Sequence, residues 1–65
     1  MEFTQLVGKR VQLHTMSGSF IGNVESTSED TLTIREVQPD GADVKMFDIT
    51  IRQSAILAVV EKVAQ

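Results

Sequence analysis

The feature that most constrains this fold is an unbroken apolar run near the end of the chain, Ile56-Leu57-Ala58-Val59-Val60. A strand with one face in water carries a polar residue at every second position, and this run carries none. Both of its faces therefore need cover, whereas a chain of 65 residues supplies a core for only one. The simplest cover for the other face is a second copy of the chain. We expect a homo-oligomer with these residues at its interface: Ile56, Leu57, Val59 and Val60.

The short length of the chain also favours an oligomer. A domain of this size buries only about 60% of its unfolded surface and usually needs a disulfide, a metal or a partner subunit. The sequence has no cysteine and a single histidine, His14, so we expect no disulfide, no metal site and no cofactor. A partner subunit remains as the stabilising element, and residues 1–65 are expected to form one domain.

The charge of the chain bears on its partners and location. The formal net charge is −3, which is the wrong sign for holding nucleic acid by bulk electrostatics, although a local basic site remains possible. The sequence contains no basic segment followed by an apolar leader and no apolar run long enough to span a bilayer. We therefore expect a soluble, cytoplasmic protein that makes no membrane contact.

Alternating apolar and polar residues predict a short helix followed by five strands. Gly8 stands where a helix commonly ends, and Gly18 and the Pro39-Asp40-Gly41 segment are hairpin signals. Short strands joined by tight turns predict an all-β, five-stranded, strongly bent antiparallel small barrel. In chain order the expected elements are a helix within Met1–Val7 and strands at Lys9–Thr15, Phe20–Ser26, Thr31–Val37, about Asp43–Arg52 and Ile56–Val60.

Three details within the strands carry specific expectations. Gly22 interrupts the second strand, which indicates a bulge, a sharp bend or a close approach of another backbone. The apolar parity changes along the fourth strand, and this predicts a bulge near Met46–Asp48. Phe20 and Phe47 are expected in the core, which leaves few aromatic rings for stacking.

The residues that catalysis requires are not arranged for it in the sequence. The single histidine lies on the polar face of an alternating strand, and no nucleophile has an evident base partner. No glycine-rich phosphate loop opens a helix, and no metal-ligand spacing appears. We expect a protein that is not an enzyme.

Across nearly its whole length the chain resembles the Sm/LSm proteins, which include the bacterial Hfq branch and phage or archaeal Sm-like rings. The segment Leu6–Val11 resembles the family's passage from helix into first strand, and Gly18 with Gly22 and Val24 resembles its first motif. Ile51-Arg52-Gln53-Ser54-Ala55-Ile56 resembles the second motif, a short turn before the last strand. The resemblance implies a ring of about five to seven subunits, in which strand four pairs with strand five of the next copy.

The resemblance also implies a site for single-stranded RNA, with departures at several positions. Ser28 stands roughly where the family has a base-binding aspartate, and Thr31 roughly where it has an asparagine. Glu29 or Asp30 occupies the place of a flat stacking residue, and Gln53 replaces a glycine. Arg52 is the residue that clearly matches the family's base-binding set. The implied RNA-binding residues are therefore Arg52, Ser28 and Thr31.

Two functions from different classes follow. The first is a ring that binds single-stranded RNA, which the predicted fold and Arg52 favour. The second is a structural or protein-binding scaffold ring that has lost the RNA pocket. The acidic charge, the shortage of stacking residues and the missing aspartate and asparagine favour the scaffold.

Overall fold

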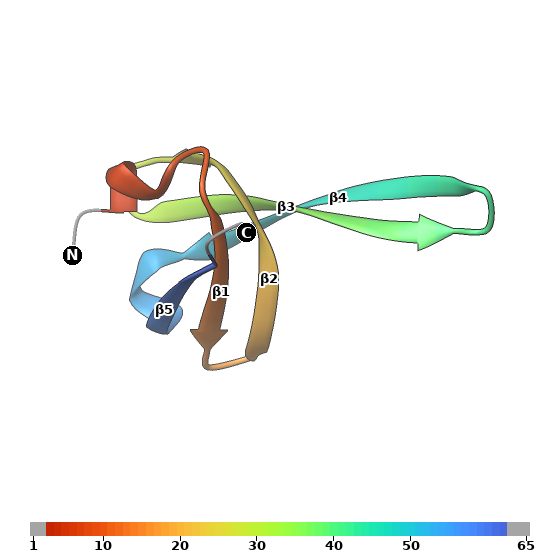
Figure 1. The fold of residues 1–65 in the computed structure, drawn as a ribbon. Coiled ribbons are helices and arrows are strands. Elements are labelled where there is room, and N and C mark those ends of the chain that lie inside the picture. The colour runs from red at the N-terminus through yellow and green to blue at the C-terminus, as the bar shows by residue number, and fades with distance from the viewer. Residues whose placement is uncertain (1–2, 63–65) are drawn as a thin grey trace.

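The computed structural model describes residues 3–62 as one five-stranded antiparallel sheet (Figure 1). The strand order is β4-β3-β2-β1-β5, so β4 and β5 form the two edges. The all-β class and the five antiparallel strands are confirmed, whereas the sheet is not closed and a barrel remains a prediction. The elements are η1 (Phe3–Leu6), β1 (Arg10–Thr15), β2 (Gly18–Thr27), β3 (Thr31–Asp40), β4 (Asp43–Arg52), η2 (Gln53–Ala55) and β5 (Ile56–Lys62).

The N-terminal segment is a single 3-10 turn, η1, rather than the predicted helix. So few residues cannot repay the cost of nucleating an α-helix, and 3-10 geometry suits short pieces. Phe3 and Leu6 hold the turn in place by packing against the core. Gly8 follows with a φ of +87°, the left-handed conformation expected of a glycine at which a helix ends. Residues 1 and 2 of the predicted helix lie outside the described part of the chain.

The buried core is small and comes from the first three strands. Its side chains alternate with exposed or half-buried ones along each strand, as expected for a sheet with one covered face. Partly buried apolar side chains of η1, β2, β4 and β5 pack around it. The five core residues are Val11, Leu13, Val24, Leu32 and Ile34.

Strand β2 departs from regular geometry at two places. A Cβ on Gly22 would lie 2.6 Å from the carbonyl oxygen of Arg35, so this glycine permits a close approach of the β3 backbone. The register of β2 against β3 shifts between Val24 and Ser26, which leaves Glu25 as the extra residue of a bulge. The expected irregularity at Gly22 is therefore a close backbone approach, and the bulge lies a few residues further on.

Strands β3 and β4 form a long hairpin that projects well beyond the other strands (Figure 1). Its ladder runs without a shift from Thr31 opposite Arg52 to Asp40 opposite Asp43, so the predicted bulge near Met46–Asp48 is wrong. The turn residue Gly41 has a φ of +64°, as the hairpin signal required. We call residues 31–35 with 48–52 the inner half, and residues 36–40 with 43–47 the outer half.

The parity change in β4 has a different cause from a bulge. Ile49 and Ile51, in the inner half, pack against the core. Val44 and Met46, in the outer half, have the opposite parity and are both 62% exposed. No core covers either face of the outer half within residues 3–62, so its apolar residues need not keep the parity of the inner half.

Strand β5 has one covered face. Ile56 and Val59 pack against the core, whereas Leu57 is 67% and Val60 42% exposed. A register shift between His14 and Thr15 of β1 accommodates Leu57 as an additional residue on β5. The predicted interface set thus divides into two core-facing and two solvent-facing side chains. The described residues include no helix with the length and apolar character that crossing a bilayer requires.

Candidate functional site

The three residues of the predicted RNA site lie at one end of the sheet. Ser28 belongs to the loop between β2 and β3, Thr31 begins β3, and Arg52 ends β4. Thr31 and Arg52 are directly opposite each other in the β3–β4 ladder. The hairpin therefore brings together residues that are far apart in the sequence.

The loop between β2 and β3 is held by its own hydrogen bonds. The Ser28 amide donates to the Thr31 carbonyl oxygen at 3.0 Å, and the Thr31 amide donates to Ser28 Oγ at 3.2 Å. The two hydroxyls are also hydrogen-bonded to each other, with 2.5 Å between Ser28 Oγ and Thr31 Oγ1. The loop is thus fixed in place by its own contacts, and both hydroxyls already have partners.

Gln53, the first residue of η2, holds this loop through hydrogen bonds. Its Nε2 donates to the carbonyl oxygens of Ser28 and Thr31, both at 2.9 Å. Its backbone amide donates to the carbonyl oxygen of Asp30 at 2.8 Å. Both amide hydrogens of the side chain are therefore used to join η2 to the β2–β3 loop.

The sequence analysis missed this clamp, because it treated Gln53 only as a replacement for a glycine. The available signal was the position of Gln53 next to Arg52. A tight hairpin at Gly41 pairs Thr31 with Arg52 and so brings that position beside the β2–β3 loop. A glutamine amide carries two donors, which match the two carbonyl oxygens, of Ser28 and Thr31, that lie near it.

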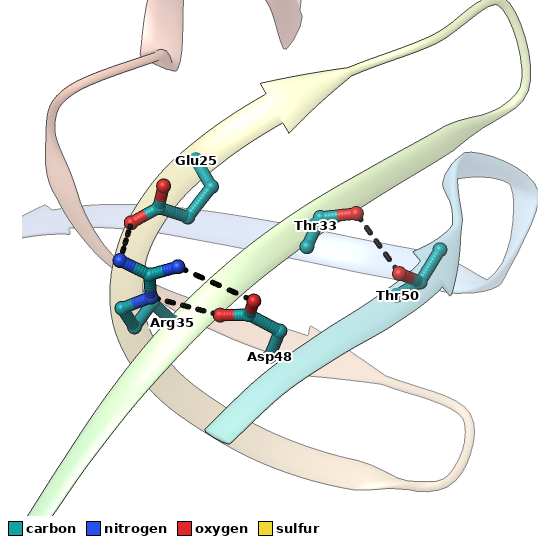
Figure 2. Close-up of polar contacts among 5 residues, drawn as sticks. All are labelled: Glu25, Thr33, Arg35, Asp48 and Thr50. Atoms are coloured by element: carbon teal, nitrogen blue, oxygen red, sulfur yellow. Dashed lines mark hydrogen bonds and ion pairs between the residues drawn. The ribbon is translucent and has the colours of Figure 1, made fainter. Parts of the chain in front are cut away.

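Two arginines near this end of the hairpin differ in their availability. Figure 2 shows the Arg35 guanidinium between two carboxylates: Nε and Nη2 donate to Asp48 at 2.9 and 3.3 Å, and Nη1 lies 3.4 Å from Glu25. The hydrogen bond to Asp48 raises the pKa of Arg35 above its ordinary value and lowers the pKa of Asp48. Arg35 is therefore already neutralised by carboxylates of this chain.

Arg52 is exposed and forms no ion pair within residues 3–62, so its guanidinium can reach a ligand. The cross-strand hydroxyl pair between the two arginines, Thr33 Oγ1 and Thr50 Oγ1 at 2.9 Å, adds neutral polar groups to the same face (Figure 2). Among the described residues, this face therefore offers the unpaired guanidinium of Arg52 beside several hydroxyls.

Negative charge adjoins Arg52. Glu29 and Asp30 are both exposed in the β2–β3 loop, and in a ring they would repeat once per subunit. Lys9 does not counter them, because its Nζ lies 3.4 Å from Glu61 Oε1 in an ion pair. The local field at the loop thus favours a neutral or weakly charged group over an isolated phosphate.

The three phenylalanines of the chain offer little to stack on a base at this site. Phe3 and Phe20 pack against the core. Phe47 is 44% exposed in the outer half of the hairpin, so the expectation that it is buried is wrong. Among the described residues of the site, the planar guanidinium of Arg52 is the group that can stack.

One contact bears on catalysis and was not foreseen. His14 Nδ1 lies 3.0 Å from Ser19 Oγ on the outer face of β1 and β2, so a serine does have a histidine neighbour. A nucleophile–base pair also needs a third group that orients the base and donors that bind a developing oxyanion. Within residues 3–62, His14 has no second side-chain hydrogen bond, and no group of acidic or histidine side chains is arranged to hold a metal ion.

Comparison of the chain with protein-family models, with curated proteins and with solved structures returns no match.

Proposed function

We propose that the chain assembles through its two sheet edges into a homo-oligomeric ring that binds single-stranded RNA. The binding site would lie at the sheet end that carries Arg52, Ser28 and Thr31. The observation that carries the proposal is their convergence, since the loop and the end of β4, which the resemblance selects through two separate motifs, lie side by side. The Sm-like resemblance of the sequence supplies the class of ligand.

The open sheet supports assembly. Edge strands expose rows of unpaired backbone groups, which natural proteins protect or pair with another chain. In this chain one edge, β5, also exposes Leu57 and Val60, and the other, β4, exposes Val44 and Met46. Pairing β4 of one copy with β5 of the next is a heterologous contact, which closes into a ring when the rotation per subunit is suitable. Such pairing would also complete a barrel-like wall around each small core.

The chemistry of the site limits what it binds. Recognition of an unstacked base needs a stacking plane and hydrogen-bonding groups for its edge. Arg52 supplies the plane and donors, while Ser28 and Thr31 supply hydroxyl oxygens. We expect a short, uridine- or adenine-rich single strand with one base at each subunit, held weakly because Glu29 and Asp30 repel phosphate.

Fluorescence anisotropy with oligo-U, oligo-A and a mixed sequence tests RNA binding on a sample whose oligomeric state is confirmed by light scattering. Arg52→Ala should lose roughly 1–3 kcal/mol of binding free energy per engaged base. Arg10→Ala is the matched control, because Arg10 is an exposed arginine on β1. Equal losses in the two variants would indicate bulk electrostatics rather than a site at Arg52.

The carboxylates give a second readout in the same assay. Neutralising them in the Glu29→Gln, Asp30→Asn double variant should tighten binding, and more so at low salt, where repulsion is poorly screened. Flat titrations for all three oligonucleotides on a confirmed oligomer would refute RNA binding at this end of the sheet.

A scaffold ring without RNA is the second candidate, and one observation favours it. The hydroxyls of Ser28 and Thr31 are hydrogen-bonded to each other, and Gln53 donates both hydrogens of its side-chain amide to carbonyl oxygens of the loop. These polar groups of the loop therefore have hydrogen-bond partners within the chain and do not need a ligand. A scaffold predicts the same oligomer, no oligonucleotide affinity at physiological salt, and no response to Arg52→Ala.

A further inference from the structure

The exposed apolar side chains of the outer half share one face of the hairpin. Val37 stands opposite Met46 and Pro39 opposite Val44 in the ladder, and opposite residues of paired strands point to the same side of a sheet. Because side chains alternate along a strand and the ladder has no shift, this face lies opposite the one on which Ile49 meets the core. Val37, Val44 and Met46 are each more than half exposed. We call Val37, Pro39, Val44 and Met46 the arm face.

The opposite face of the outer half is mostly polar. Lys45 forms an ion pair with Asp40 there, with 3.4 Å between Nζ and Oδ2, and Phe47 is the apolar exception. A two-stranded ribbon is at best marginally stable alone in water, and a separation of apolar and polar faces is the pattern of a sheet that is covered on one side. The arm face therefore needs cover that residues 3–62 of the same chain do not give. The residues of the opposite face are Glu36, Gln38, Asp40, Asp43, Lys45 and Phe47.

The β3 side of the outer half is unsuited to receive a further strand. The pairing of β3 with β2 ends at Arg35, so β3 is a free edge along the outer half. Pro39 lies on that edge, and a proline has no N–H to donate to a neighbouring strand. A partner that covers the arm face therefore packs flat against its side chains.

This face of the hairpin is complementary to itself. Each row of the ladder holds two unlike side chains: Val37 with Met46 and, in the next row of the same face, Arg35 with Asp48. A twofold axis parallel to the strands, placed above this face, sets β3 of one copy over β4 of the other, row by row. Val37 then lies over Met46 of the second copy, and Arg35 lies over Asp48 of the second copy, so opposite charges face each other. A twofold axis across the strands would instead set the tip of one hairpin over the charged row of the other.

We infer that the arm face packs against the arm face of a second copy of this chain, around a twofold axis parallel to the strands. Two sheets that pack in this way lie about 10 Å apart and are rotated by about 30°, so the contact is closest at the apolar rows and opens along the hairpin. Arg52 lies two rows beyond Arg35 on the same face and stays clear of the contact. The contact uses neither free edge of the sheet, so the inference goes beyond the proposed ring and does not depend on it.

The size of the arm face sets the strength of the contact. Exposed apolar patches of a few hundred Å² on a single chain are often functional, but a contact that buries less than about 1,200 Å² in total belongs to weak, transient complexes. Two arm faces of two residue rows each fall in this class. We therefore expect an association that depends on protein concentration and reverses on dilution.

Sedimentation equilibrium from micromolar to millimolar concentration tests the contact. The average mass of the native protein should rise with concentration. Val37→Asp puts a charge into the contact and should weaken the association about tenfold or more, because the carboxylate would lose its water there. Gln38→Asp is the matched control: it adds the same charge at the next residue, opposite Lys45 on the other face, and should associate like the native protein. A native mass equal to that of Val37→Asp at every concentration, or an equal loss in Gln38→Asp, would overturn the contact.

A mixing experiment tests the direction of the axis. Val37→Lys and Met46→Glu should each associate poorly alone, and an equal mixture should recover association, because residue 37 of one copy lies over residue 46 of the other. A mixture of Val37→Lys with Val37→Glu should stay dissociated. No recovery in the first mixture, or recovery in the second, would overturn the parallel axis. A native protein that dilutes to a monomer would refute the proposed ring and leave this inference standing, whereas a ring whose mass never exceeds that of Val37→Asp would do the reverse.

Discussion

The inner and outer halves of the β3–β4 hairpin share one continuous ladder and differ in almost everything else. In the inner half, Ile49 and Ile51 pack against the core, and the opposite face carries the Arg35–Asp48 ion pair. In the outer half, Val44 and Met46 stand in solvent. The comparison shows that turn chemistry and backbone pairing suffice to extend a hairpin, while only neighbouring elements decide which of its side chains are buried.

Truncating one side chain in each half should give the largest difference. Ile34→Ala in the inner half removes a fully buried side chain and should lower the free energy of unfolding by roughly 2–5 kcal/mol. Val37→Ala in the outer half removes an exposed one and should change it by no more than about 0.5 kcal/mol. Urea unfolding at one fixed protein concentration measures both. Comparable losses would show that the outer half is as well covered as the inner.

Two glycines extend the comparison to the backbone. Gly22→Ala places a Cβ against the Arg35 carbonyl oxygen, beside the inner half, and should cost about 1–3 kcal/mol because two strands must move apart. Gly41→Val at the tip of the outer half strains a positive φ and should cost about 1 kcal/mol. The tip can fray without releasing the core, which limits its effect. Thermal unfolding of the two variants in parallel measures the difference, and an unchanged Tm for Gly22→Ala would rule out the close approach.

The smallest effect concerns the ion pair at the border between the halves. The hydrogen bond from Arg35 holds the pKa of Asp48 below its ordinary value. Stability from this pair is therefore fully present above the unfolded-state pKa of about 3.9 and is lost as the pH falls through the lower folded-state value. Asp48→Asn should remove part of the acid dependence of the urea midpoint between about pH 2 and 5. Asp40→Asn, which removes a carboxylate from the outer half, is the matched control, and an equal effect of the two variants would contradict a special role for Asp48.

Most of the fold was predictable because alternation and turn residues act locally. Val11 and Leu13 gave the inward face of β1, and Gly41 marked the hairpin turn. The N-terminal helix was predicted at the right place, but its 3-10 type was not, because apolar spacing alone does not distinguish a 3-10 turn from the start of an α-helix. The bulge in β4 was wrong because parity was interpreted as if one core covered the whole strand, whereas Val44 and Met46 lie beyond it. How far the β3–β4 hairpin projects beyond the sheet depends on where β1, β2 and β5 end. No local sequence pattern in β3 or β4 indicates this.

The sequence predicted where the candidate site lies, but not the hydrogen bonds and ion pairs within it. Arg52 and Thr31 were selected from the resemblance, and the register of β3 against β4 puts them opposite each other. The clamp by Gln53 was missed because a side-chain bond to a distant loop depends on how two turns meet at the end of the sheet. The neutralisation of Arg35 was missed for a related reason: the bulge at Glu25 sets where that carboxylate lies.

The pairing of β5 with β1 also has a consequence for the order of folding. Every other pair of neighbouring strands is adjacent in sequence, so those contacts form across short loops, whereas β5 returns to β1 from almost the opposite end of the chain. Contacts of long sequence separation form slowly, because the entropy of closing the loop is lost before the contacts compensate for it. During synthesis, β1 through β4 are complete before Lys62 leaves the ribosome, and β1 stays an open edge throughout that interval. Among the described strands β5 is therefore made last, and it is the strand that covers the β1 edge.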